Sequence, residues 1–458
     1  MHFLPYLCAL LSTAATVTAL PKALTAATVS SKHYVTAHYL VGNAAEYTME
    51  DWQDDMAKAQ QAGIDAFALN IAYGDTNTAT SLATAFSAAA SMRSRTIRLY
   101  LNFDYEAWGA WDATSVVNTI NQYQNHSAYF KYNNQPLVST FEGTSNINDW
   151  TSIKAATNCF FMPDWSSIGP SAATTYSNII DGLASWSAWP DGPTNLTTAI
   201  DEEYISTLSG KPYMMPVSPW FYTNLPAYSK NWLWHSSSLW HYRWLESLSL
   251  SVSSTFIQIL SWNDYGESHY IGPIRSSGIV SGAELYVDSN HSHTAWLDLL
   301  PYYIYAYKLN CGFSSSSSSP FLTSGPILDS KERLTYWYKT TPNDSGSWAN
   351  TTGNNPSYQT VYDPATLSPD QIFFTVLLSS PATVSVTIGN HPSQTVDVDT
   401  KGINHFSVPI PSGEAGVVGF EVVRNGKVVL EIKGEEIVRV PENGRVNWNP
   451  VVGGGVSM

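Results

Sequence analysis

The sequence is poor in charge, and in positive charge above all. Of its 458 residues, 22 are Lys or Arg and 37 are Asp or Glu, so charged residues make up 13% and the formal net charge is −15. This balance excludes nucleic acid as a partner, because phosphate binding requires clustered Lys and Arg. Hydrophobic residues make up 44%, which is enough for a large core and excludes general disorder.

Phosphate loops and membrane-length apolar runs are also missing. The glycine-rich patterns GxGxxG and GxxxxGK[ST] do not occur, and we expect no cofactor. The apolar run from Leu4 to Leu11 is too short to span a bilayer. With the small residues Val17-Thr18-Ala19 after it, this run predicts a signal peptide over residues 1–19. We therefore expect a secreted, extracellular protein with no membrane partner.

Cysteine is scarce, with three residues in the chain. Cys8 lies in the predicted signal peptide, so Cys159 and Cys311 remain. In an oxidising compartment these two form a disulfide if the fold brings them together, and otherwise they are two buried thiols. Five N-x-Ser/Thr sequons are typical of a secreted glycoprotein; they begin at Asn125, Asn195, Asn290, Asn343 and Asn350.

Apolar runs alternate with helical patterns between residues 33 and 312. The clearest helical pattern starts at Thr48, which forms a capping box with Asp51, and ends at Gly63. Most apolar runs are continuous, as buried parallel strands are. Such an alternation predicts an α/β fold, a (β/α)8 TIM barrel, with a doubly wound open sheet as the alternative. The predicted strands are 34–42, 65–73, 96–104, 135–143, 159–165, 183–189, 211–220 and 255–262.

The composition changes after Cys311. Residues 313–319 form a serine-rich connector. Residues 320–458 contain short β runs with turn signals, and Arg424-Asn425-Gly426-Lys427 predicts a two-residue hairpin. We expect a C-terminal all-β, sandwich-like accessory domain. It either binds polysaccharide or covers an apolar face of the barrel.

Carboxylates follow several of the predicted strands, although the chain has few charges. In a barrel the loops after the strands build the active site, so these side chains should converge at one mouth. Glycoside hydrolysis needs such a set, because one carboxyl protonates the leaving oxygen while an ionised one acts on water or on the anomeric carbon. The residues concerned are Asp104, Glu142, Asp164, Asp264 and Glu267.

Aromatic residues gather at the same strand ends, and their flat faces suit the C–H faces of pyranose rings. Core packing is the alternative explanation for each ring. A metal centre is not expected, because His33 and His38 are an odd number of residues apart and a shared strand face needs even spacing. The predicted substrate contacts, besides Glu142 and Asp164, are Trp189, Trp220, Trp262, Tyr265 and His269.

The stretches AHYLVGN, LNFD, VSTFEG, PVSPWFYT and SWNDYGESHYIGP resemble glycoside hydrolase family 71, the fungal endo-α-1,3-glucanases or mutanases. The resemblance is clearest from about His33 to Lys308. It implies endo-hydrolysis of α-1,3-glucan with inversion at the anomeric carbon. The acids essential in the family correspond to Asp104, Asp264 and Glu267. We assign Glu267 as the acid and Asp264 as the base, with Asp104 positioning water or tuning their pKa values, although the sequence does not decide between these two roles.

Two alternatives stay open. One is a hydrolase or transglycosylase that acts on a different glucan. The other is a non-catalytic wall protein that binds polysaccharide, which would have no need of a crowded carboxylate pair. We expect a monomer whose partner is α-1,3-glucan.

Overall fold

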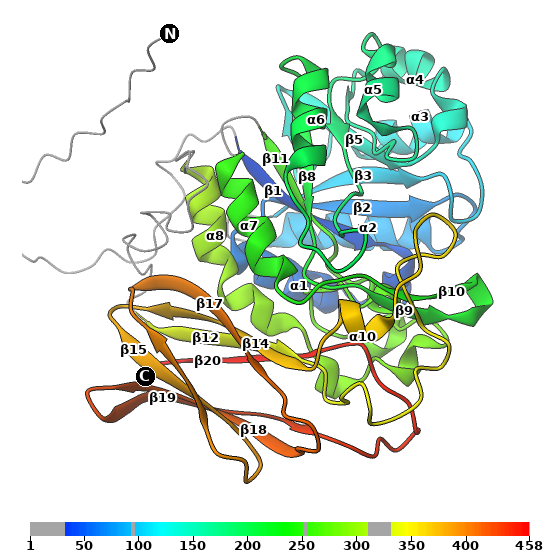
Figure 1. Cartoon of the computed structure of the whole chain (residues 1–458). Helices are drawn as coiled ribbons and strands as arrows, with labels where there is room; N and C mark the ends of the chain where they lie inside the picture. The colour runs from blue at the N-terminus through cyan, green and yellow to red at the C-terminus, as the bar shows by residue number, and fades with distance from the viewer. Residues whose placement is uncertain (1–32, 93–96, 251–253, 310–330, 458) are drawn as a thin grey trace, which may run out of the picture.

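A computed structural model describes residues 33–92, 97–250, 254–309 and 331–457 (Figure 1). The predicted signal peptide, the serine-rich connector and Cys311 lie outside these ranges, so the pairing of Cys159 stays a prediction. No helix in the described part of the chain combines the length and the apolar character that crossing a lipid bilayer requires.

A parallel sheet forms the centre of the N-terminal part, and each of the eight predicted apolar runs contributes one strand to it. Its order is β5-β3-β2-β1-β11-β8-β7, with β6 paired to β5 and the short β4 (Lys131–Tyr132) antiparallel at β5. The strands are β1 (Tyr34–Leu40), β2 (Ala66–Ala72), β3 (Arg98–Asp104), β5 (Gln135–Phe141), β6 (Phe160–Phe161), β7 (Leu183–Ala184), β8 (Tyr213–Val217) and β11 (Phe256–Ile259).

The sheet is strongly curled. The Tyr100 hydroxyl on β3 lies 3.3 Å from Thr36 Oγ1 on β1 and 3.8 Å from Met214 Sδ on β8. Three strands separate β3 from β8 in the sheet order, so this contact crosses the concave side of the sheet. A flat open sheet does not bring these two strands together.

In the described part of the chain, seven α-helices lie between successive strands of this sheet, and an eighth follows β11. The first begins at Thr48 with the predicted capping box and ends at Gly63, which has a φ of 92° that favours glycine. Its apolar stripe of Trp52, Met56 and Ala59 is fully buried. The helices are α1 (Met49–Ala62), α2 (Thr78–Ser91), α3 (Ala113–Tyr123), α4 (Asp149–Thr157), α5 (Gly169–Ala173), α6 (Ala199–Leu208), α7 (Leu239–Ser249) and α8 (Leu300–Lys308).

An antiparallel hairpin of β9 (Tyr222–Leu225) and β10 (Lys230–Leu233) follows β8 and was not predicted. The strand β13 (Thr352–Gly353), from much later in the chain, pairs with β10 in parallel. Asn231 adds two hydrogen bonds to the same segment: its Nδ2 donates to the carbonyl of Ala349 at 2.9 Å, and its Oδ1 accepts from Thr351 Oγ1 at 2.8 Å. The hairpin is therefore held by the C-terminal part.

Two four-stranded antiparallel sheets make up most of the C-terminal part, beside the short helix α10 (Pro364–Leu367). They share one apolar cluster, and the predicted hairpin joins two of their strands at Arg424 and Lys427. The first sheet has the order β17 (Gly402–Pro409), β14 (Gln371–Leu378), β12 (Arg333–Tyr338), β20 (Val451–Val456). The second has the order β16 (Gln394–Val398), β15 (Ala382–Ile388), β18 (Gly416–Arg424), β19 (Lys427–Ile437).

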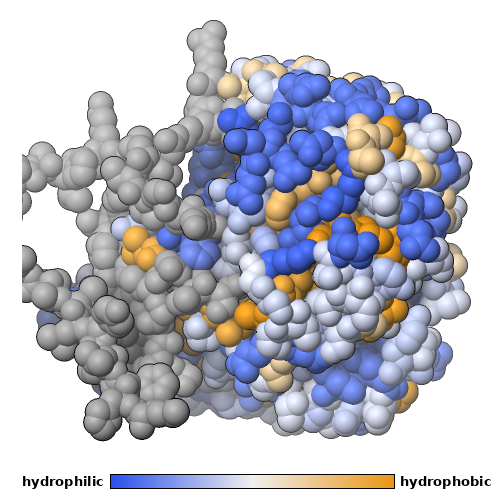
Figure 2. All heavy atoms as spheres, turned by 90° about the horizontal axis from the view of Figure 1, so that it is seen from above, coloured by the Kyte–Doolittle hydropathy of each residue, from blue (hydrophilic) through white to orange (hydrophobic). Residues whose placement is uncertain are grey.

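The first of these sheets lies between the second and the rest of the protein (Figure 1). Its Trp337 belongs to the large core of the α/β part and donates from Nε1 to the carbonyl of Ser237 at 2.7 Å. Further along, Trp220 Nε1 donates to the carbonyl of Trp448 at 3.0 Å. The C-terminal sheets therefore cover an apolar face of the α/β part. On the face seen in Figure 2, hydrophilic residues predominate and hydrophobic residues show in narrow bands between them.

Candidate active site

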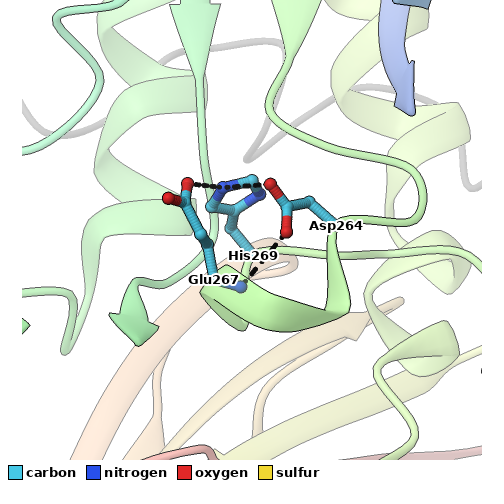
Figure 3. Close-up of side chains that lie close together, drawn as sticks. All are labelled: Asp264, Glu267 and His269. Carbon is cyan, nitrogen blue, oxygen red and sulfur yellow. Dashed lines mark hydrogen bonds and ion pairs between the residues drawn. The ribbon is translucent and has the colours of Figure 1, made fainter. Parts of the chain in front are cut away.

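Three side chains of the turn after β11 meet in one cluster (Figure 3). Asp264 caps the 3-10 helix Tyr265–Glu267, and its Oδ1 accepts the backbone N–H of Glu267 at 3.2 Å. The Nε2 of His269 lies 3.0 Å from Glu267 Oε2 and 3.7 Å from Asp264 Oδ2. The two carboxylates are 14% and 18% exposed whereas His269 is fully buried, so the acids have surface open to solvent and the imidazole lies behind them.

The orientation of His269 follows from its second nitrogen. Nδ1 lies 2.9 Å from Ser261 Oγ, and the same hydroxyl oxygen accepts the backbone N–H of Asp264 at 3.0 Å. The Ser261 hydroxyl thus links the imidazole to the backbone of the turn, and Nε2 faces the two carboxylates, which accept its proton in a hydrogen bond. Ser261 and His269 thus fix the position of both acids.

Lys230, on the unpredicted hairpin, also contacts the cluster, and the sequence analysis did not predict it. Its Nζ lies 2.7 Å from Glu267 Oε1. The negative charge of Glu267 raises the pKa of Lys230, and the charges of Asp264 and Asp104 raise it further. All three predicted acids therefore act on the same ammonium group. A lone lysine in a short hairpin carries no motif, so no signal in the sequence identifies it.

The two acids of the turn have opposed pKa shifts. Burial, together with the negative charge of Glu267, raises the pKa of Asp264 to about 6. Burial alone would also raise the pKa of Glu267, but the charge of Lys230 and the hydrogen bond from His269 hold it well below its usual range. At mildly acidic pH, Asp264 keeps a proton while Glu267 is an anion. Such a division of protonation states is what acid–base catalysis by two carboxyls requires.

Asp104 lies at the end of β3. Its Oδ1 accepts the backbone N–H groups of Glu106 and Ala107, both at 2.9 Å. Burial raises its pKa, although these two hydrogen bonds act in the opposite direction. Asp104 is thus held by its own loop and acts on Lys230 through its charge.

Glu142 and Asp164 form a second acidic pair. Glu142 accepts from the backbone N–H of Ser167 at 2.8 Å, and Asp164 Oδ1 accepts from the backbone N–H of Ser166 at 3.1 Å. Burial, followed by the charge of Glu142, raises the pKa of Asp164 to about 8. The hydrogen bonds and ion pairs of the described residues do not join this pair to Asp264 or Glu267.

The raised pKa of Asp164 predicts a pH-dependent stability. Because the folded state favours the protonated acid, its contribution to stability is complete below pH 4 and is lost as the pH rises through about 8. Asparagine resembles the protonated form. We expect the melting temperature of Asp164→Asn to fall less than that of the wild type between pH 5 and pH 8, by at least ~2 °C, the shift that about 1 kcal/mol produces. Thermal denaturation at several pH values measures this.

The exposed Asp399 provides the matched control for that experiment. Asp399→Asn makes the same chemical change without altering a buried group. Its melting temperature, plotted against pH, should therefore run parallel to that of the wild type. If the melting temperature of Asp164→Asn also runs parallel to that of the wild type, Asp164 is ionised in the folded protein throughout this pH range, and the prediction is wrong.

The predicted aromatic contacts divide into two groups. Trp189 stacks on Trp234 with ring centroids 5.0 Å apart, and its ring centroid lies 5.4 Å from that of His269, so it borders the site. Trp262 and Tyr265 are 0% exposed and Trp220 is 4% exposed. These three rings pack in the core around the turn, and their contact with substrate stays a prediction.

Asp264, Glu267 and His269 also form a possible metal-binding group, with one ligand atom of each within 4.8 Å of the others. Glu267, however, is already paired with the Lys230 ammonium at 2.7 Å. A cation bound there would be repelled by Nζ. The ion pair with Lys230 therefore favours a metal-free carboxylate site.

A curled parallel sheet with two partly exposed carboxyls in the turn after a strand suits glycoside hydrolysis. The chain belongs to glycosyl hydrolase family 71, whose model matches residues 31–457. It is 35% identical to a mutanase of Penicillium rubens over 414 residues, 88% of this chain and 85% of that protein. It is also 35% identical to a glucan endo-1,3-alpha-glucosidase of Schizosaccharomyces pombe over 419 residues, 88% of this chain and 91% of that protein.

Among solved structures, the GH99 endo-alpha-mannosidase of Bacteroides thetaiotaomicron is similar at 12% identity with a TM-score of 0.48, over 60% of this chain and 97% of that one. A similarity at this level carries no information about the substrate.

Proposed function

We propose that this protein hydrolyses α-1,3-glucan and cuts within the polymer. The names of the Penicillium and Schizosaccharomyces relatives support this substrate and, for the latter, internal cleavage. The observation that carries the proposal is the pair of carboxyls after β11 with opposed pKa shifts, one of them held as an anion by Lys230.

The electrostatics favour the reverse of the roles assigned from the sequence. The carboxyl that protonates the leaving oxygen must carry a proton at the working pH, and Asp264 has the raised pKa. Glu267 is the anion, and we propose that it acts on water or on the developing positive charge at the anomeric carbon. Asp104, through its charge at Lys230, then helps to keep that lysine protonated.

Inversion stays a prediction from the resemblance. Inverting pairs stand about 6.5–9.5 Å apart, whereas retaining pairs stand about 5–5.5 Å apart. One oxygen of Asp264 and one of Glu267 lie within 4.8 Å of each other. This distance joins single oxygens, whereas the two spacings refer to whole carboxyl groups, so it is compatible with either outcome.

We also propose that residues 33–312 form a closed (β/α)8 barrel and that residues 320–458 form a sandwich-like domain. Closure is supported by the parallel bridges Phe141–Asp164 and Asp164–Ala184, which link β5 to β7 across the end of β6. The sandwich is supported by the apolar cluster between the two C-terminal sheets. Secretion is proposed from residues 1–19.

The proposed function is tested by incubating the purified protein with insoluble α-1,3-glucan and, separately, with β-1,3-glucan. We expect reducing ends only from the first, with oligosaccharides of several lengths appearing early in chromatography. NMR of the first product distinguishes inversion, which gives the β-anomer, from retention, which gives the α-anomer. Adsorption without any release of reducing ends would contradict the proposal and favour a non-catalytic wall-binding protein.

A further inference from the structure

His38 on β1 is a buried side chain that the catalytic roles above do not use. It is 3% exposed, and neither ring nitrogen has a hydrogen-bond partner among the residues that the structure describes. Leaving a buried donor and a buried acceptor unsatisfied is costly, because neither group recovers the hydrogen bond that it makes with water in the unfolded chain. A bound water or a ligand hydroxyl would supply the partners that the two ring nitrogens lack.

The backbone of His38 is joined to the turn that carries the acids. Its carbonyl accepts the backbone N–H of Trp262 at 2.8 Å, and two residues later the backbone N–H of Leu40 donates to Asn263 Oδ1 at 2.8 Å. β1 and β11 are also neighbours in the sheet. His38 therefore lies beside the strand end from which Asp264 and Glu267 project.

The side chain of His38 is close enough to the acids to feel their charges. Burial, together with the charge of His269, lowers its pKa to about 3, while the charge of Glu267 acts in the opposite direction. The edge of the imidazole meets Trp186, with ring centroids 5.0 Å apart at 79°. The ring is thus a neutral imidazole, with one donor and one acceptor, next to the catalytic cluster.

Sugar hydroxyls match this pair of groups, because each hydroxyl both donates and accepts. We propose that His38 binds a hydroxyl group of the glucosyl unit held at Asp264 and Glu267, and so helps to select a sugar with that hydroxyl. This inference rests on the proposed function, since it assigns a substrate contact to the same site. A site built to bind a hydroxyl rejects the analogue that lacks it more strongly than apolar contacts can.

The experiment compares a soluble α-1,3-linked gluco-oligosaccharide with analogues that each lack one hydroxyl of the unit next to the cleaved bond. For the wild type we expect one analogue to lose about 10-fold to 100-fold in kcat/KM. For His38→Ala we expect lower kcat/KM on the parent sugar and almost no further loss with that analogue. An unchanged pattern of losses in His38→Ala would overturn the proposal.

His241 supplies the matched control. It is also a buried, neutral imidazole, but its Nδ1 is bonded to the Tyr303 hydroxyl at 2.8 Å and it lies on α7. His241→Ala should lose thermal stability while keeping the wild-type pattern across the analogues. If both variants change that pattern equally, the effect of His38 is structural and the proposal fails.

Two further measurements separate the remaining outcomes. If His38→Ala does not fold, His38→Gln restores a donor and an acceptor and should recover part of the discrimination. The second measurement uses NMR of 15N-histidine-labelled Glu267→Gln protein, which binds the sugar without cleaving it. The imidazole resonance of His38 is identified as the one that His38→Gln removes. It should shift when the parent oligosaccharide binds, and the absence of a shift counts against the contact. A wild type inactive on the parent sugar instead contradicts the proposed function.

Discussion

We expect Glu267→Gln and Asp264→Asn each to lower kcat on α-1,3-glucan by about 10²–10⁴-fold, the range that general acid–base groups contribute. The two variants should differ on an α-configured oligoglucosyl fluoride, whose leaving group needs no proton. Asp264→Asn should keep most of its turnover on the fluoride, because only proton donation is lost. Glu267→Gln should lose both activities, because no anion faces the anomeric carbon. Steady-state rates with the two substrates measure this difference.

The exposed Glu442 gives the matched control, since Glu442→Gln makes the same change away from the site and should leave both rates unaltered. Melting temperatures of all three variants show whether each one folds. If Glu267→Gln keeps the fluoride activity and Asp264→Asn loses it, the roles are the reverse of those proposed from the pKa shifts.

Lys230→Met should lower kcat/KM by about 10-fold to 100-fold and shift the pH profile of kcat/KM toward higher pH. The positive charge of Lys230 lowers the pKa of Glu267 and also that of Asp264, so both values rise when the charge is removed. Activity requires Glu267 ionised and Asp264 protonated, and the acidic limb should move up by about one to three pH units, the effect of one neighbouring charge. The pH dependence of kcat/KM measures this.

Lys230→Arg keeps the charge and is the control for that experiment. We expect its pH profile to stay near that of the wild type even if its geometry lowers the rate. A Lys230→Met profile that falls in height without moving along the pH axis would mean that the lysine acts only by holding the hairpin, and that the proposed electrostatic role is incorrect.

Much of the fold could be predicted because its signals are local. A continuous apolar run such as 96–104 identifies a buried strand, and Thr48 with Asp51 fixes the start of a helix through two hydrogen bonds within one turn. The hairpin at Arg424 and Lys427 follows from the positive φ values of Asn425 and Gly426. The β9–β10 hairpin has no such signal, and its other partner, β13, lies more than one hundred residues later in the chain.

The candidate acids could also be predicted from local sequence. The carboxyl ends of parallel strands all lie at the same edge of a sheet, so residues that follow these strands gather there. The direction of a side chain within the following turn has no such rule. Trp262 and Tyr265 flank Asp264 in sequence, yet the turn at 261–269 directs both rings into the core. Lys230 could not be found, because its partner Glu267 is 37 residues away and is reached only in the folded chain.

The bonds between Asn231 and the segment at 349–351 bear on how this protein can be divided. A fragment that stops before residue 331 would still contain Asp104, Asp264 and Glu267. It would lack the strand that holds the lysine hairpin in place, so the anion at Glu267 would lose a fixed counter-charge. We therefore expect a chain cut before residue 331 to lose catalytic activity although it keeps every predicted acid, because the segment that braces the lysine hairpin comes from the C-terminal part.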